Sequence, residues 1–221
     1  MKIREYYDRT AGEGTPNYQE SSVWMNALVH RPNERFVRRQ VRRALRDAAS
    51  IADIGCGTGE RLCADFPNLK RLVLNDLSSV MLDDASNRLR AVHGAFEIDS
   101  HLGSIETIPA DARPCEVAIC LGVLNHFEPG PLRDALAAIA RLAEKKILLY
   151  YAHEAFLLAA RVGVSFRRVD IHYRAIERAW VARALGDAGF DLFRSTYAFG
   201  LPILSPLVVQ EFRAGKRAGG G

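Results

Sequence analysis

The chain has 221 residues, of which 48% are hydrophobic and 25% are charged, the composition of a globular domain large enough to bury its own core. No stretch approaches the roughly 20 apolar residues of a membrane-spanning helix. The charged and aromatic N-terminus also lacks the apolar centre of a signal peptide. The sequence therefore predicts no membrane span, and we expect a cytoplasmic protein.

The cysteine and charge patterns argue against several further classes of protein. The four cysteines contain no C-x-x-C pair and lie in apolar segments, which predicts reduced packing residues rather than disulfides or a zinc site. The net charge of +4 comes mainly from arginine, whose densest run is residues 38–46. Apolar residues on the other side of the same predicted helix favour a solvated helix face over a nucleic-acid patch.

The first part of the chain, residues 1–48, is predicted to form a helical lid. Residues 17–30 and 33–48 have the pattern of two helices that are separated at Arg31–Pro32. A βα alternation follows. Strands are predicted at residues 49–54, 71–76, 95–99, 116–121 and 147–151, and helices at residues 58–66, 79–92 and 131–145. Strands that alternate with helices indicate a parallel sheet covered on both faces.

The last part of the chain departs from this alternation. A helix is predicted at residues 176–188, followed by two strands at 190–197 and 207–212 that form a closing hairpin. The whole pattern predicts an α/β domain over residues 49–213: a doubly wound, mostly parallel seven-stranded sheet with an antiparallel terminal strand, in a Rossmann-like three-layer α/β/α arrangement. Residues 214–221 are expected to be a disordered tail.

The most informative segment is the turn after the first predicted strand, Gly55-Cys56-Gly57-Thr58-Gly59. Its glycines allow a sharp bend at the carboxyl edge of the sheet and remove side chains that would block a ligand. The helix predicted after the turn would present its free N–H groups there. Asp76 ends the next predicted strand, where a carboxylate accepts hydrogen bonds from both hydroxyls of a ribose. Together these features predict an adenosine-containing cofactor.

Two details decide between cofactors. A dinucleotide-binding turn has the spacing G-x-G-x-x-G, whereas the third glycine here comes one residue early. Asp53 stands two residues before the first glycine, where its carboxylate would repel a pyrophosphate and attract a sulfonium and an ammonium group. S-adenosylmethionine carries both of these cations, so the turn favours S-adenosylmethionine.

Four segments, at residues 53–60, 75–82, 122–127 and 186–190, resemble the successive motifs of class I S-adenosylmethionine-dependent methyltransferases. The resemblance covers residues 49–212 and implies roles for individual positions. The residues that it implies at the methionine end of the cofactor are Asp53, Gly55, Cys56, Gly57, Leu121 and Gly122. At the adenosine end, Asp76 is implied to bind the ribose and Leu77 to pack on the adenine.

One segment departs from the family's pattern. Where the family often has an acidic residue near the adenine amino group, this chain has Ser104, within residues 103–109. Either Ser104 together with Ile105 makes the adenine contact, or Asp99 or Glu106 does so in another register. We favour Ser104 with Ile105.

Methyl transfer to an oxygen acceptor usually also needs a base, and two histidines are candidates for this catalytic role. His126 follows the fourth predicted strand and His153 the fifth. A histidine pKa of about 6.5 suits proton transfer from a hydroxyl or an amine, although either residue also suits a structural role. Cys56 is expected to be a passive spacer. The segment after the fourth strand has no adjacent carboxylates, so no metal is predicted.

The sequence therefore predicts an S-adenosylmethionine-dependent methyltransferase that transfers a methyl group in line to an oxygen or nitrogen atom of a small-molecule metabolite. The first alternative is a methyltransferase of RNA or another macromolecule, but no Asn/Asp-Pro-Pro-aromatic segment follows the fourth strand. The glycine spacing argues against a second alternative, a nicotinamide-dependent oxidoreductase. A third is a non-catalytic module that binds an adenosyl ligand. Both a monomer and a homodimer are compatible with the sequence.

Overall fold

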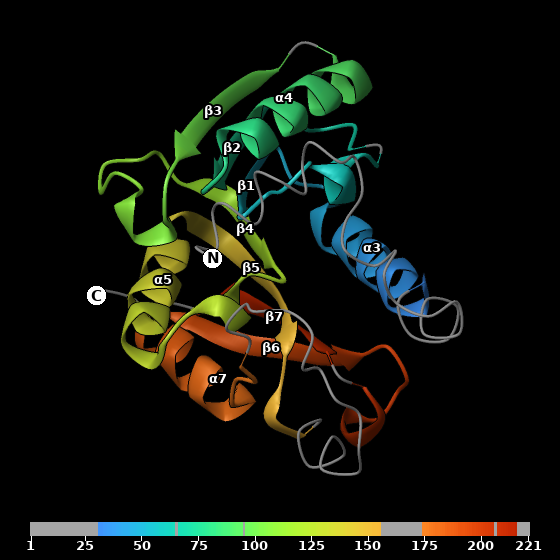
Figure 1. Ribbon diagram of the computed structural model, residues 1–221, viewed down its shortest axis with the longest axis vertical. Coiled ribbons are helices and arrows are strands. Elements are labelled where there is room, and N and C mark those ends of the chain that lie inside the picture. Colours follow the sequence, from blue (N-terminus) through green and yellow to red (C-terminus); the bar gives the residue numbers. More distant parts are fainter. Residues whose placement is uncertain (1–30, 65, 95, 156–173, 206, 216–221) are drawn as a thin grey trace, which may run out of the picture.

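The computed structural model describes residues 31–64, 66–94, 96–155, 174–205 and 207–215. Within them, seven strands form one sheet in the order β3-β2-β1-β4-β5-β7-β6 (Figure 1). The strands are β1 (Ser50–Ile54), β2 (Arg71–Asp76), β3 (Glu97–Leu102), β4 (Cys115–Leu121), β5 (Ala143–Ala152), β6 (Phe190–Tyr197) and β7 (Leu207–Ala214). The helix predicted at residues 17–30 and most of the predicted tail lie outside the described residues.

Neighbouring strands are parallel across most of the sheet. β1 pairs in parallel with β2 and β4, β2 pairs with β3, and β4 pairs with β5. β7 lies between β5 and β6 and runs antiparallel to both. The predicted fold class, a mostly parallel seven-stranded sheet with an antiparallel strand near its end, is therefore confirmed.

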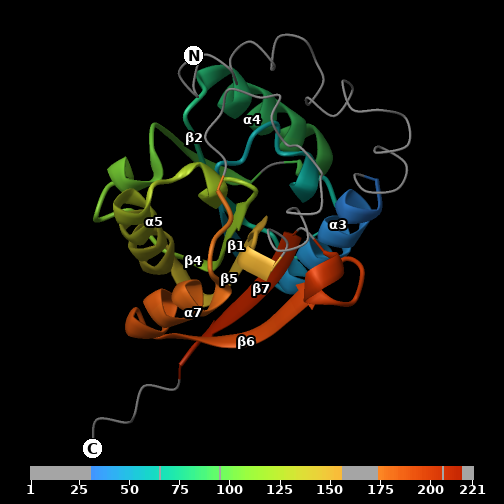
Figure 2. The ribbon, with the colours of Figure 1, turned by 60° about the horizontal axis from the view of Figure 1, so that its bottom comes forward.

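Helices cover both faces of the sheet (Figure 2). They are α3 (Arg31–Leu45), α4 (Ser79–His93), α5 (Pro129–Arg141) and α7 (Arg178–Asp187), with 3₁₀ turns η3 (Glu60–Leu62), η4 (Ile105–Thr107), η5 (Leu124–His126) and η6 (Pro202–Leu204). One hydrophobic cluster joins α3 and α4 to one face, and a second joins α5 and α7 to the other. Successive strand residues alternate between the clusters, because their side chains point to opposite faces. None of the described helices is long and apolar enough to cross a membrane.

The helix α3 begins at Arg31, two residues before its predicted start, and ends at Leu45 rather than at residue 48. Pro32 lies in its first turn. The first N–H groups of a helix have no partner within the helix, so a proline there removes no hydrogen bond. The buried side of α3 includes Val37 and Val41, which attach it to the sheet.

Two other predicted elements shift along the chain. α5 covers Pro129–Arg141 instead of residues 131–145, because residues from Ala143 onward pair with β4. β3 covers Glu97–Leu102 instead of residues 95–99, in parallel register with the whole of β2. The order of the elements is unchanged, so these shifts do not move the candidate site to another edge of the sheet.

The largest difference from the predicted fold follows the glycine turn. The predicted helix at residues 58–66 is wrong, and only the 3₁₀ turn η3 forms there. Gly57 and Gly59 adopt φ of +53° and +70°, outside the right-handed helical region. Pro67 disfavours helical backbone at the residue before it, so the stretch in between is too short to nucleate an α-helix.

Candidate cofactor-binding site

The carboxyl ends of the five parallel strands β1 to β5 meet at one edge of the sheet. The residues that directly follow these strands are Gly55, Leu77, Gly103, Gly122 and His153. From β1 the chain passes to β2 and β3 on one side, whereas β4 and β5 lie on the other side. Open α/β sheets bind ligands in the crevice at such a switch point. The predicted cofactor residues therefore gather where the topology favours a ligand.

Backbone hydrogen bonds fix the glycine turn to the end of β2. The N–H group of Gly55 donates to the carbonyl oxygen of Asn75 at 2.8 Å. The N–H group of Gly57 donates to Oδ2 of Asp76 at 2.9 Å, and that of Ser78 donates to Oδ1 at 3.0 Å. The Asp76 carboxylate is therefore held in one orientation beside the turn, without the helix N-terminus that the sequence predicts there.

Glycine is required at two positions of the turn for different reasons. Gly55 has φ of +67°, and a Cβ at this residue would lie 2.3 Å from Cγ2 of Val123. Gly57 has φ of +53°, and no atom lies within 4 Å of the place where its Cβ would be. Gly55 thus allows close packing against the loop after β4, whereas Gly57 borders open space in which a ligand can approach the backbone.

Cys56 stands between these two glycines and is half buried. Its Sγ lies 3.5 Å from the carbonyl oxygen of Gly57, to which the thiol donates. Burial, together with the negative charges of Asp53 and Asp76, raises the pKa of the Cys56 thiol well above its ordinary value. The thiol is therefore protonated at neutral pH and is not activated as a nucleophile.

Asp53 is a buried acid near the end of β1, with only 4% of its surface exposed. Alternation along the strand places its side chain on the face that α3 covers, the same face as Ile51. Burial raises the pKa of the Asp53 carboxyl to about 7, the nearby Asp76 carboxylate raises it further, and the Arg61 guanidinium opposes both. A cation beside this carboxyl would favour its ionised form.

Arg61 lies at the candidate site, although no sequence pattern predicts it there. Its Nη1 donates to the carbonyl oxygen of Leu121, the last residue of β4, at 2.9 Å. Its guanidinium carbon lies 5.6 Å from the centre of the Tyr150 ring, and Nη1 lies 3.9 Å from where a Cβ of Gly122 would be. Arg61 therefore stands where Leu121 and Gly122 are predicted to approach the methionine end of the cofactor.

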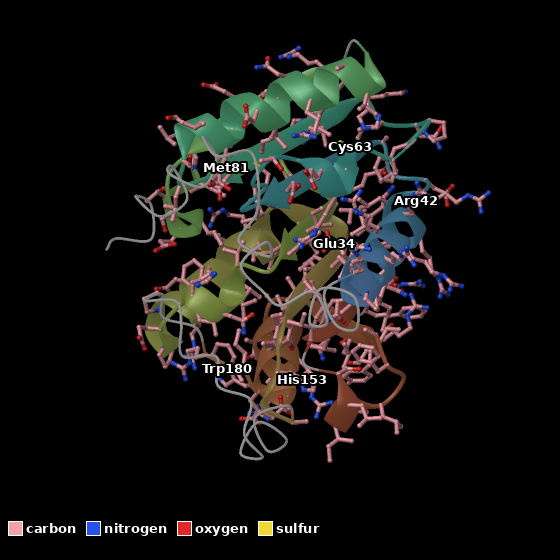
Figure 3. All side chains as sticks on the ribbon, turned by 45° about the vertical axis from the view of Figure 1, so that its right-hand side comes forward. Glu34, Arg42, Cys63, Met81, His153 and Trp180 are labelled. Atoms are coloured by element: carbon pink, nitrogen blue, oxygen red, sulfur yellow. The ribbon has the colours of Figure 1, made fainter. Side chains whose placement is uncertain are left out.

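Arg61 also connects the site to α3. Its Nε and Nη2 donate to the two carboxylate oxygens of Glu34 at 3.2 and 3.3 Å. Glu34 lies on the side of α3 that faces the sheet (Figure 3). This bidentate, charge-assisted pair fixes the described part of the predicted lid to the turn after the glycines.

The predicted adenosine end of the site lies beside β2 and β3. The Asn75 amide donates to the carbonyl oxygens of His101 and Gly103 at 3.0 and 2.9 Å, which ties the end of β2 to the loop after β3. Ser104 is half buried and directly precedes η4. Ile105 is 3% exposed and packs in the core. The structure thus brings Ser104 to the edge where Asp76 lies.

The two alternative acids lie in different surroundings. Oδ2 of Asp99 is 3.3 Å from Nη1 of Arg71, so an adenine contact by Asp99 would break this ion pair. Glu106 is exposed on η4, and Leu77, predicted to pack on the adenine, is half buried after β2. Of the three candidates, Ser104 is placed best for an adenine contact. This contact stays a prediction.

The two candidate catalytic histidines also differ. His126 is half buried at the end of η5. His153 is fully buried, and its Nε2 is 2.8 Å from the carbonyl oxygen of Ser205, so this nitrogen carries the proton of the ring. Burial and the positive charge of Arg178 lower the pKa of His153. His153 thus makes a structural contact, and a catalytic role for either histidine stays a prediction.

Asn125 is a second residue whose contacts are not evident from the sequence. Its amide nitrogen donates to the carbonyl oxygens of Ala152 and Arg174 at 2.9 and 2.6 Å, and its Oδ1 accepts from the N–H group of Ala152 at 2.9 Å. The side chain is fully buried, so it joins the loop after β4 to the end of β5. No group of three or more His, Cys, Asp or Glu residues in the described part of the chain is placed to hold a metal ion.

Comparisons with known proteins identify similar methyltransferases. Residues 51–146 match the model of a methyltransferase domain. Over 151 aligned residues, the chain is 26% identical to the chloroplastic magnesium protoporphyrin IX methyltransferase of Arabidopsis thaliana. The aligned part covers 65% of this chain and 46% of that protein, so the chain spans less than half of that relative's length.

The fold is also similar to solved structures. The magnesium protoporphyrin IX methyltransferase of Synechocystis PCC 6803 with bound S-adenosylhomocysteine has a TM-score of 0.73 and 18% identity, over 96% of this chain and 98% of that one. The N-methyltransferase NodS of Bradyrhizobium japonicum WM9 with the same ligand has a TM-score of 0.70 and 14% identity, over 96% and 98%. The fold is that of the class I S-adenosylmethionine-dependent methyltransferases. The match to the methyltransferase-domain model is limited to residues 51–146, which are less than half of the chain.

Proposed function

We propose that the protein is an S-adenosylmethionine-dependent methyltransferase that methylates an oxygen or nitrogen atom of a small-molecule acceptor. The observation that carries this proposal is the buried Asp53 carboxyl near the end of β1, directly before the glycine turn, with the carboxylate of Asp76 held beside the same turn. Burial makes the Asp53 carboxylate costly to ionise, and a sulfonium or ammonium group beside it would offset this cost.

In this proposal, the site residues divide the cofactor between them. Asp53 attracts the cationic methionine end, Gly57 allows the ligand to approach the backbone, and Asp76 accepts hydrogen bonds from the ribose hydroxyls. When bound, the cofactor supplies an activated methyl group, so the chain has mainly to align donor and acceptor and exclude water. Alignment of this kind contributes up to roughly 7–11 kcal/mol in model reactions.

A small-molecule acceptor is supported by the segment after β4 and by the relatives. That segment is Leu124-Asn125-His126-Phe127, which lacks the two consecutive prolines typical of amino-group methylation in nucleic acids. Two of the similar proteins are named as methyltransferases of magnesium protoporphyrin IX. Magnesium protoporphyrin IX is therefore the first acceptor to test.

His126 is the better placed histidine to accept a proton from the acceptor. It lies half buried just beyond β4, whereas His153 is buried and bound to Ser205. Replacement of His126 by asparagine is expected to lower kcat by about 10²–10⁴-fold without changing the affinity for S-adenosylhomocysteine. An unchanged kcat would remove His126 from the mechanism and leave the proposed reaction intact.

Calorimetric titration tests the cofactor. S-adenosylhomocysteine is expected to bind the protein, and Asp76→Ala is expected to weaken binding by roughly 10–100-fold, since hydrogen bonds to a charged group are lost. The matched control is Asp83→Ala, which removes an exposed carboxylate of α4 and is expected to bind like the wild type. Binding of a nicotinamide dinucleotide in place of S-adenosylhomocysteine would favour the oxidoreductase and overturn the proposal.

Turnover assays separate the remaining alternatives. Methyl transfer is measured as release of S-adenosylhomocysteine, with magnesium protoporphyrin IX or a mixture of RNAs as the acceptor. Methylated RNA would favour a macromolecular substrate over the small molecule proposed here. Binding of the cofactor without turnover on either acceptor would favour a module that only binds an adenosyl ligand.

A further inference from the structure

The positive charge of the chain is concentrated on α3 and the residue that follows it. Residues 31–46 contain seven arginines and one glutamate, a net charge of +6 against +4 for the whole chain, so all the other residues together carry −2. The seven arginines are all exposed: Arg31, Arg35, Arg38, Arg39, Arg42, Arg43 and Arg46. Arg38 pairs with Glu34 and Glu60, whereas the last four form no ion pair with the described residues.

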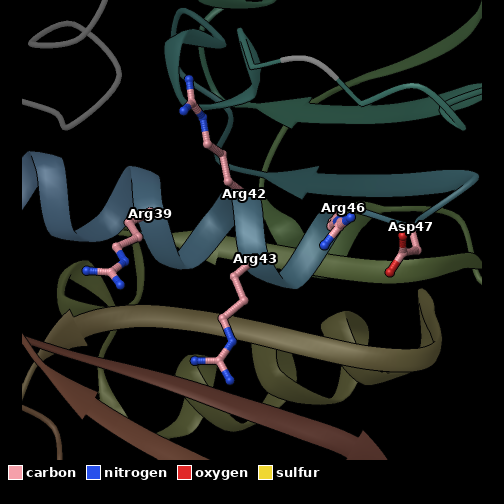
Figure 4. A pocket seen from close by; sticks show the side chains of 5 residues that line it. All are labelled: Arg39, Arg42, Arg43, Arg46 and Asp47. Carbon is pink, nitrogen blue, oxygen red and sulfur yellow. The ribbon is translucent and has the colours of Figure 1, made fainter.

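These last four arginines, with Asp47, line a broad hollow beside the helix (Figure 4). Its volume is about 670 Å³. Arg39 and Arg43 extend towards the strands on one side of the helix, and Arg42 extends to the opposite side. Because the guanidinium groups spread apart instead of converging, they fit an extended anionic surface better than a single bound anion.

An apolar loop connects β6 to β7. Leu201, Ile203 and Leu204 are 57%, 59% and 60% exposed, respectively. Residues 198–206 contain no charged side chain. Single exposed aliphatic residues are common on protein surfaces, but three within four positions of an uncharged loop form a patch of the kind that contacts another apolar phase.

The base of this loop is held in place. Ser205 is fully buried, and its hydroxyl accepts a hydrogen bond from the N–H group of Phe199 at 3.0 Å. Its carbonyl oxygen accepts from Nε2 of His153 at 2.8 Å. The loop therefore has a fixed base next to β5, and its apolar side chains project from it.

The loop and the basic helix are neighbours. Leu207, the first residue of β7 after the loop, packs against the hydrophobic cluster that contains Val37 and Val41 of α3. Figure 2 shows the loop close to α3, and in Figure 1 the loop lies below the helix. Arg39 and Arg43, which extend from α3 towards the strands, are therefore the arginines best placed to act together with the exposed aliphatic side chains of the loop.

We propose that α3 and the β6–β7 loop form a surface that docks the protein onto a bilayer rich in anionic lipids. The arginines pair with lipid phosphates, while Leu201, Ile203 and Leu204 enter the boundary between headgroups and acyl chains. Neither contribution alone gives lasting attachment, and a basic patch combined with an apolar anchor is the pairing that holds peripheral proteins at such surfaces.

A nucleic acid is a poorer match for the same surface. Unpaired bases stack on aromatic rings and gain little from branched aliphatic side chains. Phe193 on β6 is exposed, but its ring already contacts two cations, because the guanidinium carbons of Arg213 and Arg194 lie 3.3 and 5.4 Å from its centre. The most exposed side chains of the loop are aliphatic, and Phe199 is less exposed at 37%, so the loop favours the lipid surface over a polyanion without an apolar layer.

Co-sedimentation with vesicles tests the proposal on the full chain. The protein is expected to bind vesicles of phosphatidylcholine with one third phosphatidylglycerol, not vesicles of phosphatidylcholine alone, and added salt is expected to weaken binding. Arg39→Gln with Arg43→Gln is expected to weaken binding about 25-fold, or about fivefold per arginine. The matched control, Arg90→Gln with Arg133→Gln on α4 and α5, removes the same charge and is expected to bind like the wild type.

A second variant tests the loop. Leu201→Ser, Ile203→Ser and Leu204→Ser together are expected to weaken vesicle binding while its salt dependence is kept. Equal losses in the arginine pair and in its control, or no loss in the loop variant, would overturn the proposal. So would RNA binding that is tighter than vesicle binding and insensitive to the loop changes. Affinity for S-adenosylhomocysteine and circular dichroism, measured on every variant, distinguish loss of docking from loss of fold or cofactor.

Discussion

Two buried charged side chains lie at opposite edges of the sheet, in contrasting surroundings. Arg71 opens β2 at the amino edge and is 4% exposed. Its guanidinium donates to the carbonyl oxygens of Arg113 and Pro114 and pairs with Asp99. Asp53, near the end of β1 at the carboxyl edge, is also 4% exposed. No hydrogen bond from the described residues contributes to the pKa of Asp53, which burial raises to about 7.

This contrast is the one expected between a charge that serves the fold and a charge that binds a ligand. A buried charge that is fully hydrogen-bonded is part of the fold. Removal of one of its partners destabilises the fold, because the remaining charge stays buried without compensation. A buried carboxyl that lacks such partners is destabilising by itself, and strongly shifted pKa values cluster at binding sites for this reason. Among the described residues, the sheet therefore provides hydrogen-bond partners for the Arg71 guanidinium and leaves the Asp53 carboxyl without them, as the proposed cofactor site would require. Four substitutions test this difference.

Arg71→Met is expected to lower the free energy of unfolding by about 3 kcal/mol, because two carbonyl oxygens and Asp99 lose their buried partner. Urea denaturation measures this loss. The protein that remains folded is expected to bind S-adenosylhomocysteine with unchanged affinity. Arg90→Met, at an exposed position of α4, serves as the control with little change in stability. If Arg71→Met left the stability unchanged but weakened ligand binding, Arg71 would contribute to the cofactor site instead of to the fold.

Asp53→Asn is expected to have the opposite effect on stability. The pKa of Asp53 rises from 3.8 to about 7 on folding, so the folded state binds more protons and wild-type stability falls as the pH rises between these values. Above pH 7 the variant is expected to be about 2 kcal/mol more stable, less than the shift alone implies because asparagine still buries polar atoms. Below pH 4 this advantage disappears.

Urea denaturation across this pH range, combined with calorimetric titration of S-adenosylhomocysteine, checks the Asp53→Asn result. The variant is expected to gain stability and lose ligand affinity. Asp84→Asn, which changes an exposed carboxylate of α4, is expected to alter neither. If the Asp53 variant is less stable than the wild type at high pH, the carboxylate is a structural group like Arg71.

Arg61→Met tests how a neighbouring charge affects Asp53, because the Arg61 guanidinium lowers the pKa of the Asp53 carboxyl. Without the Arg61 guanidinium, the pKa of Asp53 is expected to rise further above 7. If ligand binding needs the ionised carboxylate, affinity at neutral pH then falls about tenfold for each unit by which this pKa rises. Affinity for S-adenosylhomocysteine is therefore expected to recover as the pH is raised. Arg61→Lys keeps the charge and is expected to retain most of the affinity. A loss of affinity that is the same at every pH would exclude this coupling.

The parts of the site that the sequence predicts are local in the chain. Asp53, Gly55 and Gly57 follow one another across a strand and its turn, and Asp76 ends the next strand, so hydrophobic periodicity and glycine spacing suffice to place them together. The same periodicity establishes the sheet and its closing hairpin. These predictions needed no knowledge of which distant segments pack against each other.

Arg61 and Asn125 were missed because their partners are distant in sequence. Arg61 contacts Leu121 and Glu34, which lie 60 and 27 residues away in the sequence. From the sequence alone, an arginine in a predicted helix is expected to lie on the solvent-exposed side of that helix. The predicted helix at residues 58–66 was wrong, because Gly59 adopts a left-handed backbone conformation. The glycine motif alone does not reveal this conformation. Asn125 binds Ala152 across the loop after β4, a contact that only the packed structure reveals.

Ser78 is hydrogen-bonded both to the helix α4 and to Asp76, so its substitution can separate stability from ligand binding. The expected effect is the smallest of the four. Its side chain caps α4 by accepting from the N–H group of Met81 at 3.2 Å, whereas its backbone N–H holds Oδ1 of Asp76. Ser78→Ala removes the cap alone and is expected to cost about 1 kcal/mol of stability in urea denaturation. Affinity for S-adenosylhomocysteine is expected to stay unchanged, as it is for the control Ser79→Ala. If affinity falls with stability, side-chain packing at this edge orients Asp76, and fold and ligand binding share the same residues there.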